Sequence, residues 1–209
     1  MLSEEGGCLS VVDLQTRDAG EQRYLLPLNA LWGEENLQFG APKLSYTLAR
    51  VRRGARLGAL IDGAYDERFA RDMVARMVRG ETLATQGGSI RFVGTEALRA
   101  MQDLEPVRPL SGEQSNVSIA LSDQALLKIY RRLRAGAQPE IEVARFLSEE
   151  AGFANTPAFL GAADWEAADG ETTTLATAFA FVRNQGDAWS AIVDALDRAL
   201  EQISFESLG

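Results

Sequence analysis

A lysine within an apolar strand is the residue whose position most suggests chemistry. Lys128 lies inside the run 126–130, Leu-Leu-Lys-Ile-Tyr, with hydrophobic neighbours on both sides. An ammonium group is costly to bury unless anions face it, and phosphates or a carboxylate would meet that need. The alternative is a lysine of an edge strand whose charged end reaches water.

A carboxylate follows early in the next expected helix, at 139–150. From its first turns, Glu142 could reach back to the strand that carries Lys128. A Lys–Glu pair between a strand and a helix holds the lysine on nucleotide phosphates in protein kinases. The alternative is that Glu142 is a solvated helix residue beside Glu140.

Two connections could complete a nucleotide site around this lysine. The polar loop 111–116, Ser-Gly-Glu-Gln-Ser-Asn, could offer backbone N–H groups to phosphate oxygens, with side-chain donors from Ser115 and Asn116. With a single glycine, this loop also fits an ordinary hairpin tip. The strand end at 178–182 leads through 183–187 into a helix, where main-chain groups could face adenine. Any strand-to-helix connection shares that order.

The composition excludes several chemistries. The 209 residues contain no histidine, which removes Ser-His-Asp and Cys-His nucleophiles, a histidine general base and His-rich metal sites. Cys8 is the single cysteine, so no internal disulfide can form, and we interpret it as a small strand residue.

The charge and hydropathy patterns limit the classes of partner and the location that we expect. A net charge of -9 argues against nucleic acid and anionic membranes, and the basic runs 50–56 and 131–134 are expected to be solvated faces. No apolar run approaches the ~20 residues of a membrane span, and the first residues lack a secretory-signal pattern. We therefore expect a cytoplasmic protein.

Spacing predicts two units of an α+β chain. Short apolar or alternating segments predict four strands of an antiparallel sheet, at 10–14, 23–28, 44–51 and 56–61. A helix capped by Asp66 and ending near Gly80 is expected to cover one face of that sheet.

The second unit contains more strands than helices. Strands are expected at 90–93, 107–110, 117–120, 125–130, 159–164 and 173–182, and helices at 96–101, at 139–150 and from Asp187 onward. This order of hairpin, lysine-bearing strand, helix, two strands, hinge and helix suits a nucleotide held under a small antiparallel lobe.

Four segments resemble, in order, the maltokinases. They are 111–118, 126–132, 139–147 and 181–189. The segment 49–56 is more weakly similar to the N-terminal cap of that family, so the resemblance covers nearly the whole chain. It implies a cap of antiparallel sheet plus helix at 1–88 and a protein-kinase-like ATP-binding N-lobe at 89–186. Residues 187–209 would be the first helix leading to a helical C-lobe that is absent from this sequence.

The resemblance implies a sugar phosphotransferase. Such enzymes use ATP and Mg²⁺ to convert maltose to maltose 1-phosphate in trehalose and α-glucan metabolism, often within a polypeptide that carries a trehalose synthase domain. Lys128 would hold phosphates and Glu142 would orient it. A loop containing Gln114, Ser115, Asn116 and Ser118 would cover the phosphates, and the backbone from Ala180 to Val182 would meet adenine.

The sequence departs from the family at the catalytic motif. The catalytic aspartate of maltokinases lies in a His-Gly-Asp segment and their metal-binding aspartate follows in the C-lobe, whereas this chain has no histidine. We expect this chain alone to be inactive, with no catalytic or metal-binding residue of its own, and to dimerise through exposed apolar residues around Trp189 and Leu196. The alternative is a self-sufficient, non-catalytic module that binds a nucleotide, a glucan or a partner domain.

Overall fold

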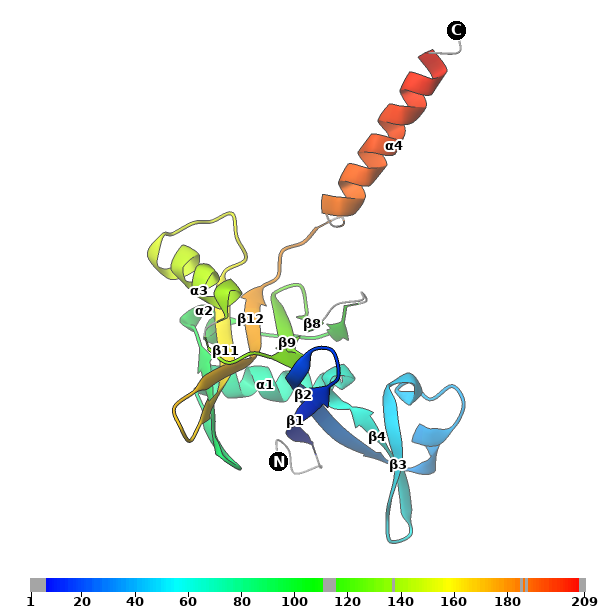
Figure 1. Ribbon diagram of the computed structural model, residues 1–209, viewed down its shortest axis with the longest axis vertical. Coiled ribbons are helices and arrows are strands. Elements are labelled where there is room, and N and C mark those ends of the chain that lie inside the picture. Colours follow the sequence, from blue (N-terminus) through cyan, green and yellow to red (C-terminus); the bar gives the residue numbers. More distant parts are fainter. Residues whose placement is uncertain (1–6, 111–115, 137, 185, 187, 207–209) are drawn as a thin grey trace.

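Two antiparallel sheets divide the chain (Figure 1). The computed structural model describes residues 7–110, 116–136, 138–184, 186 and 188–206. These residues form the predicted α+β fold, with antiparallel sheets and four α-helices.

The first sheet contains the four strands expected in the first unit. Its order is β1-β2-β4-β3, from β1 (Cys8–Thr16), β2 (Gly20–Trp32), β4 (Arg56–Asp62) and β3 (Thr47–Arg53). The strand expected at 44–51 begins instead as a 3-10 turn, Leu44–Tyr46. A fifth, unexpected strand, β10 (Arg132–Leu133), pairs with β2. The first sheet therefore includes a strand from the second half of the chain.

The second sheet has seven strands in the order β5-β6-β11-β12-β9-β8-β7. They are β5 (Thr82–Thr85), β6 (Gly88–Gly94), β11 (Phe159–Ala167), β12 (Thr172–Ala180), β9 (Ala125–Tyr130), β8 (Asn116–Leu121) and β7 (Val107–Pro109). The six strands expected in this unit are confirmed, and β5 was not expected. The neighbours β8, β9 and β12 form the half of the sheet that carries Lys128.

Helix α1 (Glu67–Arg79) begins and ends as predicted but packs on the other sheet. Asp66 caps its first turn by accepting from the Arg68 N–H, and Gly80 ends it at a φ of 63°, in the left-handed region. The expectation that it covers the first sheet is wrong, because its apolar face lies against β6. A glycine makes this approach possible: a Cβ at Gly94 would lie 2.4 Å from the carbonyl oxygen of Met77.

The position of α1 moves the division between the units. The expected boundary after residue 88 falls directly after the first residue of β6, which pairs with β5 in the seven-stranded sheet. Because α1 packs there too, the part of the chain built on the first sheet ends near Asp66.

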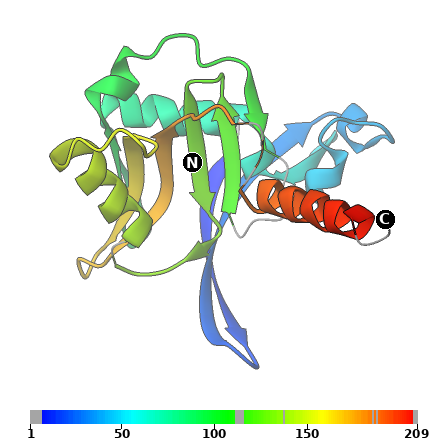
Figure 2. The ribbon, with the colours of Figure 1, turned by 90° about the horizontal axis from the view of Figure 1, so that it is seen from above.

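The remaining helices of the second sheet are short. Helix α2 (Glu96–Ala100) is capped by Thr95, and α3 (Pro139–Arg145) starts with its proline in the first turn and continues as a π-helix, Phe146–Glu150. Helices α1 and α3 are well separated in Figure 2. On β11, Gly161 approaches α1 and Asp164 lines a hollow with α3 residues, so the two helices cover opposite faces.

Arg131 joins the two sheets directly after the lysine-bearing strand. Its guanidinium pairs with the carboxylate of Asp62 and lies 5.8 Å from the ring centre of Tyr65. Its carbonyl oxygen accepts from the Leu25 N–H at 2.8 Å. These contacts fix the end of β9 against the first sheet.

Helix α4 (Ala188–Glu206) stands away from both sheets (Figure 1). Its large apolar side chains are exposed and recur every three or four residues: Trp189, Ile192, Leu196, Leu200 and Ile203. In the described part of the chain, no helical lobe accompanies it, and no helix combines the length and apolar character that a membrane crossing needs.

Candidate functional site

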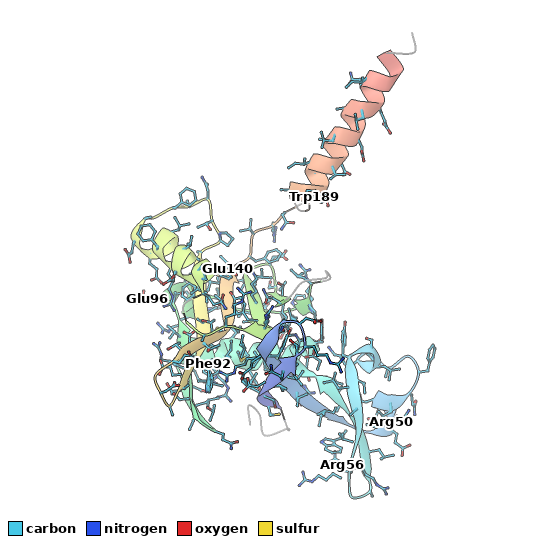
Figure 3. The ribbon with its side chains drawn as sticks, in the orientation of Figure 1. Arg50, Arg56, Phe92, Glu96, Glu140 and Trp189 are labelled. Atoms are coloured by element: carbon cyan, nitrogen blue, oxygen red, sulfur yellow. The ribbon has the colours of Figure 1, made fainter. Side chains whose placement is uncertain are left out.

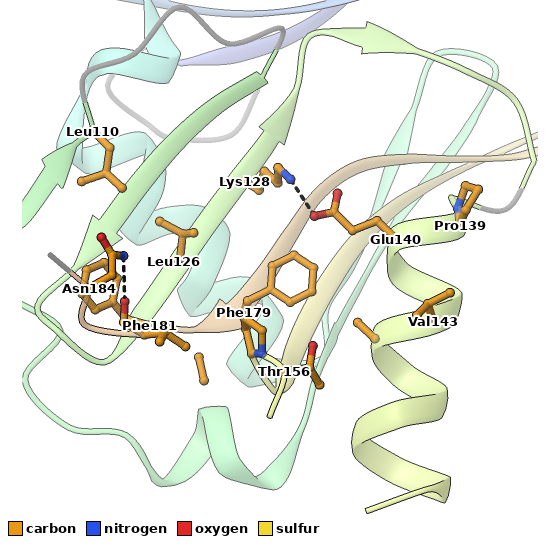
Figure 4. A pocket seen from close by; sticks show the side chains of 14 residues that line it. Leu110, Leu126, Lys128, Pro139, Glu140, Val143, Thr156, Phe179, Phe181 and Asn184 are labelled. Carbon is orange, nitrogen blue, oxygen red and sulfur yellow. Dashed lines mark hydrogen bonds and ion pairs between the residues drawn. The ribbon is translucent and has the colours of Figure 1, made fainter. Parts of the chain in front are cut away.

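A cleft of about 600 Å³ lies between α3 and strands β9 and β12 of the seven-stranded sheet (Figure 4). It is lined by Leu110, Leu126, Lys128, Pro139, Glu140, Val143, Ala144, Thr156, Pro157, Phe179, Ala180, Phe181, Val182 and Asn184. Most of these side chains are apolar, and the charged ones are together at one end. This volume and composition are typical of small-molecule sites.

Strand alternation places Lys128 in the cleft. Leu127 and Ile129 are fully buried in the core, so Lys128, which lies between them, faces the opposite side of the sheet. Lys43 and Lys128 are the only lysines of the chain. Of the two, Lys128 is the one whose ammonium group lies in an apolar cleft.

A carboxylate of α3 holds this lysine. The Lys128 Nζ lies 2.6 Å from the Oε1 of Glu140, and the Tyr130 hydroxyl donates to the other oxygen of Glu140 at 3.1 Å. Burial, together with the neighbouring carboxylate, raises the pKa of Tyr130, so its hydroxyl stays a donor. Two side chains of β9 are thus fixed to the first turn of α3.

The expected partner, Glu142, does not contact Lys128. Ile141 and Ala144 are the buried residues of α3, and Glu140 and Glu142 lie on either side of Ile141, each about 100° away around the helix. Glu140 faces β9, whereas Glu142 faces a separate hollow beside Arg91 and Asp164. The predicted Lys128–Glu142 pair is therefore wrong, and Glu140 takes its place.

The other end of the cleft is an apolar slot closed by the strand-to-helix connection. Leu126 pairs with Phe179 across β9 and β12, and Val182 is 54% exposed at the rim. The backbone N–H of Phe181 donates to the Gln124 carbonyl oxygen at 2.9 Å. The Val182 N–H has no backbone hydrogen-bond partner among the described residues, and Val182 lines the cleft.

Some of the remaining residues predicted to bind the nucleotide line the cleft and others do not. Ala180 and Val182 line it. Asn116 begins β8, and Ser118 is opposite Lys128 in the strand register and only 8% exposed, but neither is a lining residue. Gln114 and Ser115 lie outside the described residues.

Several lining residues were missed from the sequence. Leu110, Leu126, Val143 and Phe179 read there as ordinary core residues of strands and a helix, and no motif separates them from the rest of the core. Leu126 and Phe179 lie on the sheet face that carries α3, and Val143 lies on α3 itself, so only the tertiary arrangement brings them together.

The described residues offer no group of three or more acidic, histidine or cysteine side chains that could hold a metal ion. The cleft provides a single ammonium group, paired with a single carboxylate. This part of the chain can therefore fix an anionic, partly apolar ligand.

Comparison with known proteins identifies the fold. No protein-family model matches the sequence. A structure described as "Glucosamine kinase in complex with glucosamine, ADP and inorganic phosphate" aligns with a TM-score of 0.52 at 18% identity, over 93% of this chain and 37% of that chain. A second, glucosamine kinase in crystal form A, aligns with a TM-score of 0.53 at 18% identity, over 93% of this chain and 36% of that chain.

This likeness is one of fold, because the sequence identity is low. The chain spans just over a third of the length of these enzymes. It has the α+β, sugar-kinase-like fold of part of such an enzyme, with antiparallel sheets like those of a kinase N-lobe.

Proposed function

We propose that the cleft binds ATP and that this chain is the nucleotide-binding part of an ATP-dependent sugar kinase. The observation that carries the proposal is the position of Lys128, which is held by Glu140 at one end of an otherwise apolar cleft. The similarity in fold to a sugar kinase that was solved with ADP supports it.

In this proposal, the two ends of the cleft bind the two ends of the nucleotide. Adenine lies against the apolar side chains of Leu126 and Phe179, which are neighbours on one face of the sheet, and its edge meets the backbone at Val182. The phosphates then extend toward Lys128, whose ammonium group neutralises part of their charge. Glu140 and Tyr130 act as positioning residues, because Glu140 contacts the lysine and Tyr130 contacts Glu140.

Phosphoryl transfer depends mainly on positioning and charge stabilisation, and this cleft can supply part of both. The base that accepts the proton of the sugar hydroxyl and the main ligands of Mg²⁺ would lie in a C-terminal lobe. Mg²⁺ held there would neutralise part of the phosphate charge. We therefore expect nucleotide binding, but no phosphoryl transfer, from these 209 residues alone.

The finer proposal concerns the acceptor. The resemblance of the sequence to maltokinases favours maltose, which would be converted to maltose 1-phosphate in a cytoplasmic pathway of trehalose or α-glucan metabolism, next to a trehalose synthase domain. The structural neighbours are named for glucosamine, which makes glucosamine the second candidate. ADP release by the polypeptide read to its natural stop codon, with maltose, glucosamine and glucose in parallel, would separate the two.

Isothermal titration of this chain with ATP tests the nucleotide proposal directly. The wild type should bind one ATP. A salt-bridged contact to a charged group contributes about 1.5–3 kcal/mol, so Lys128→Ala should weaken binding about 10- to 100-fold. Lys43→Ala is the matched control, because Lys43 pairs with Glu67 outside the cleft.

Two results would count against this assignment. ATP affinity that is the same in Lys128→Ala and wild type would place any nucleotide elsewhere. A folded wild type that does not bind ATP at millimolar concentration would favour the non-catalytic module that binds a glucan or a partner domain.

A further inference from the structure

A second pocket, of about 440 Å³, lies on the first sheet and shares no lining residue with the nucleotide cleft. It is lined by Ala30, Leu31, Trp32, Asn36, Arg53, Arg56 and Arg68. Three of these residues are arginines and none is acidic, although the chain as a whole has a net charge of -9. This local excess of positive charge in an acidic protein calls for a physical explanation.

Two of the arginines are held next to each other by the strand register. Arg53 and Arg56 are direct cross-strand partners at the end of the β3–β4 hairpin. Like charges directly opposite each other destabilise a sheet. Among the described residues, neither has a carboxylate within ion-pair distance, so an anion would offset this repulsion. Arg68 differs, because it pairs with Asp66 at 2.9 Å.

An indole ring forms the floor next to these arginines. The guanidinium of Arg56 lies 5.7 Å from the ring centre of Trp32. Gly58 is the cross-strand partner of Trp32, and a Cβ at Gly58 would lie 3.0 Å from the indole. The glycine therefore lets the ring lie over β4, where it keeps Arg56 in place by a cation–π contact. Figure 3 shows Arg56 on the hairpin that projects from the first sheet.

We propose that this pocket binds a phosphate monoester of a small polar molecule, with Arg53 and Arg56 on the phosphate. The forked guanidinium group matches phosphate oxygens in a bidentate manner, and a dianion balances two neighbouring arginines. The Asn36 amide and the Trp32 ring offer polar and flat surfaces to the rest of the ligand. The volume is within the range of small-molecule sites.

Isothermal titration of the whole chain with glucose 6-phosphate, glucose and inorganic phosphate tests the proposal. Glucose 6-phosphate should bind with a stoichiometry of one, inorganic phosphate more weakly, and glucose not detectably. Binding should weaken as KCl is raised, because the contacts are between charges near solvent.

The register offers an informative variant. Arg56→Glu should form an ion pair with Arg53 and leave the hairpin at least as stable, yet weaken glucose 6-phosphate binding about 10- to 100-fold. Arg50→Glu carries the same change of charge on the opposite face of β3, where its cross-strand partner is Ala59. It should alter affinity less than about threefold.

Lys128→Ala separates this pocket from the nucleotide cleft. Glucose 6-phosphate binding should persist in this variant, whether or not ATP binds the wild type, so the two proposals can fail independently. The inference is overturned if glucose 6-phosphate does not bind, if Arg50→Glu and Arg56→Glu weaken binding equally, or if Lys128→Ala abolishes it.

Discussion

Replacing Glu140 by glutamine removes the carboxylate that holds Lys128. The structure predicts that Lys128 is energetically coupled to Glu140 and is not coupled to Glu142. The Lys128 Nζ is 2.6 Å from Glu140, whereas Glu142 lines a different hollow. A double-mutant cycle isolates such a pairwise energy, because losses that each variant suffers separately cancel.

The expected coupling follows from exposure. The side chains of Lys128 and Glu140 are 23% and 45% exposed, so water screens the pair in part. Exposed ion pairs contribute about 0.2–1 kcal/mol to stability, and the lower exposure of Lys128 places this pair near the upper end, at about 1 kcal/mol. The Lys128–Glu142 cycle should give a coupling near zero.

The two cycles need free energies of unfolding, measured in urea at neutral pH, for the wild type and five variants. These variants are Lys128→Met, Glu140→Gln, Glu142→Gln and the two doubles that combine Lys128→Met with either glutamate change. Lys128→Met keeps the length of the side chain and removes its charge. The coupling with Glu140 should shrink at high salt. Coupling of Lys128 with Glu142 that equals or exceeds that with Glu140 would refute the assignment of Glu140.

Three further predictions concern the elements around the site. Burial by itself raises the pKa of Asp66, but hydrogen bonds from Arg68 and Asn29 outweigh it and leave the pKa lowered, so its stabilisation is complete above its unfolded pKa of about 3.9 and is lost as pH falls through the lower folded value. Asp66→Asn should therefore lower Tm at pH 7 and give a shallower loss of Tm below pH 5, and an acid slope equal to that of the wild type would contradict this. Arg131→Met should lower the free energy of unfolding in urea by about 2 kcal/mol, which is less than the loss of a fully buried ion pair because the Arg131–Asp62 pair keeps some exposure. The control Arg132→Met replaces an exposed residue and should change the free energy of unfolding by less than about 0.5 kcal/mol. Equal losses in the two variants would argue against the link between the sheets. We also propose that the apolar stripe of α4 pairs two copies of this chain, so Leu196→Glu should reduce dimerisation in sedimentation velocity and Asp197→Lys should not; a wild type that stays monomeric at high concentration would contradict it.

Much of the fold could be predicted because local signals were strong. Asp66 and Gly80 mark the ends of α1, and the alternation in 125–130 marks β9. The partner of α1 could not be predicted, since its apolar stripe fits either sheet. The close approach of β6 to α1 depends on Gly94, which reads as an ordinary glycine in the sequence.

The candidate site could be predicted only in part, because some of its residues give local signals and others depend on tertiary packing. A lysine within an apolar strand is a local signal, and Lys128 does line the cleft. The choice between Glu140 and Glu142 depends on which side of α3 faces β9, which is a property of tertiary packing. Strand β10 pairs with β2 through two residues, too few to give a periodic pattern.

A crystal structure of this chain with a non-hydrolysable ATP analogue tests the central proposal most directly. The account predicts adenine against Leu126 and Phe179, its edge at the Val182 backbone, and phosphate oxygens within hydrogen-bond distance of the Lys128 Nζ. A nucleotide bound anywhere else, including the arginine-lined pocket beside Trp32, or a cleft that stays empty at saturating analogue, would contradict it.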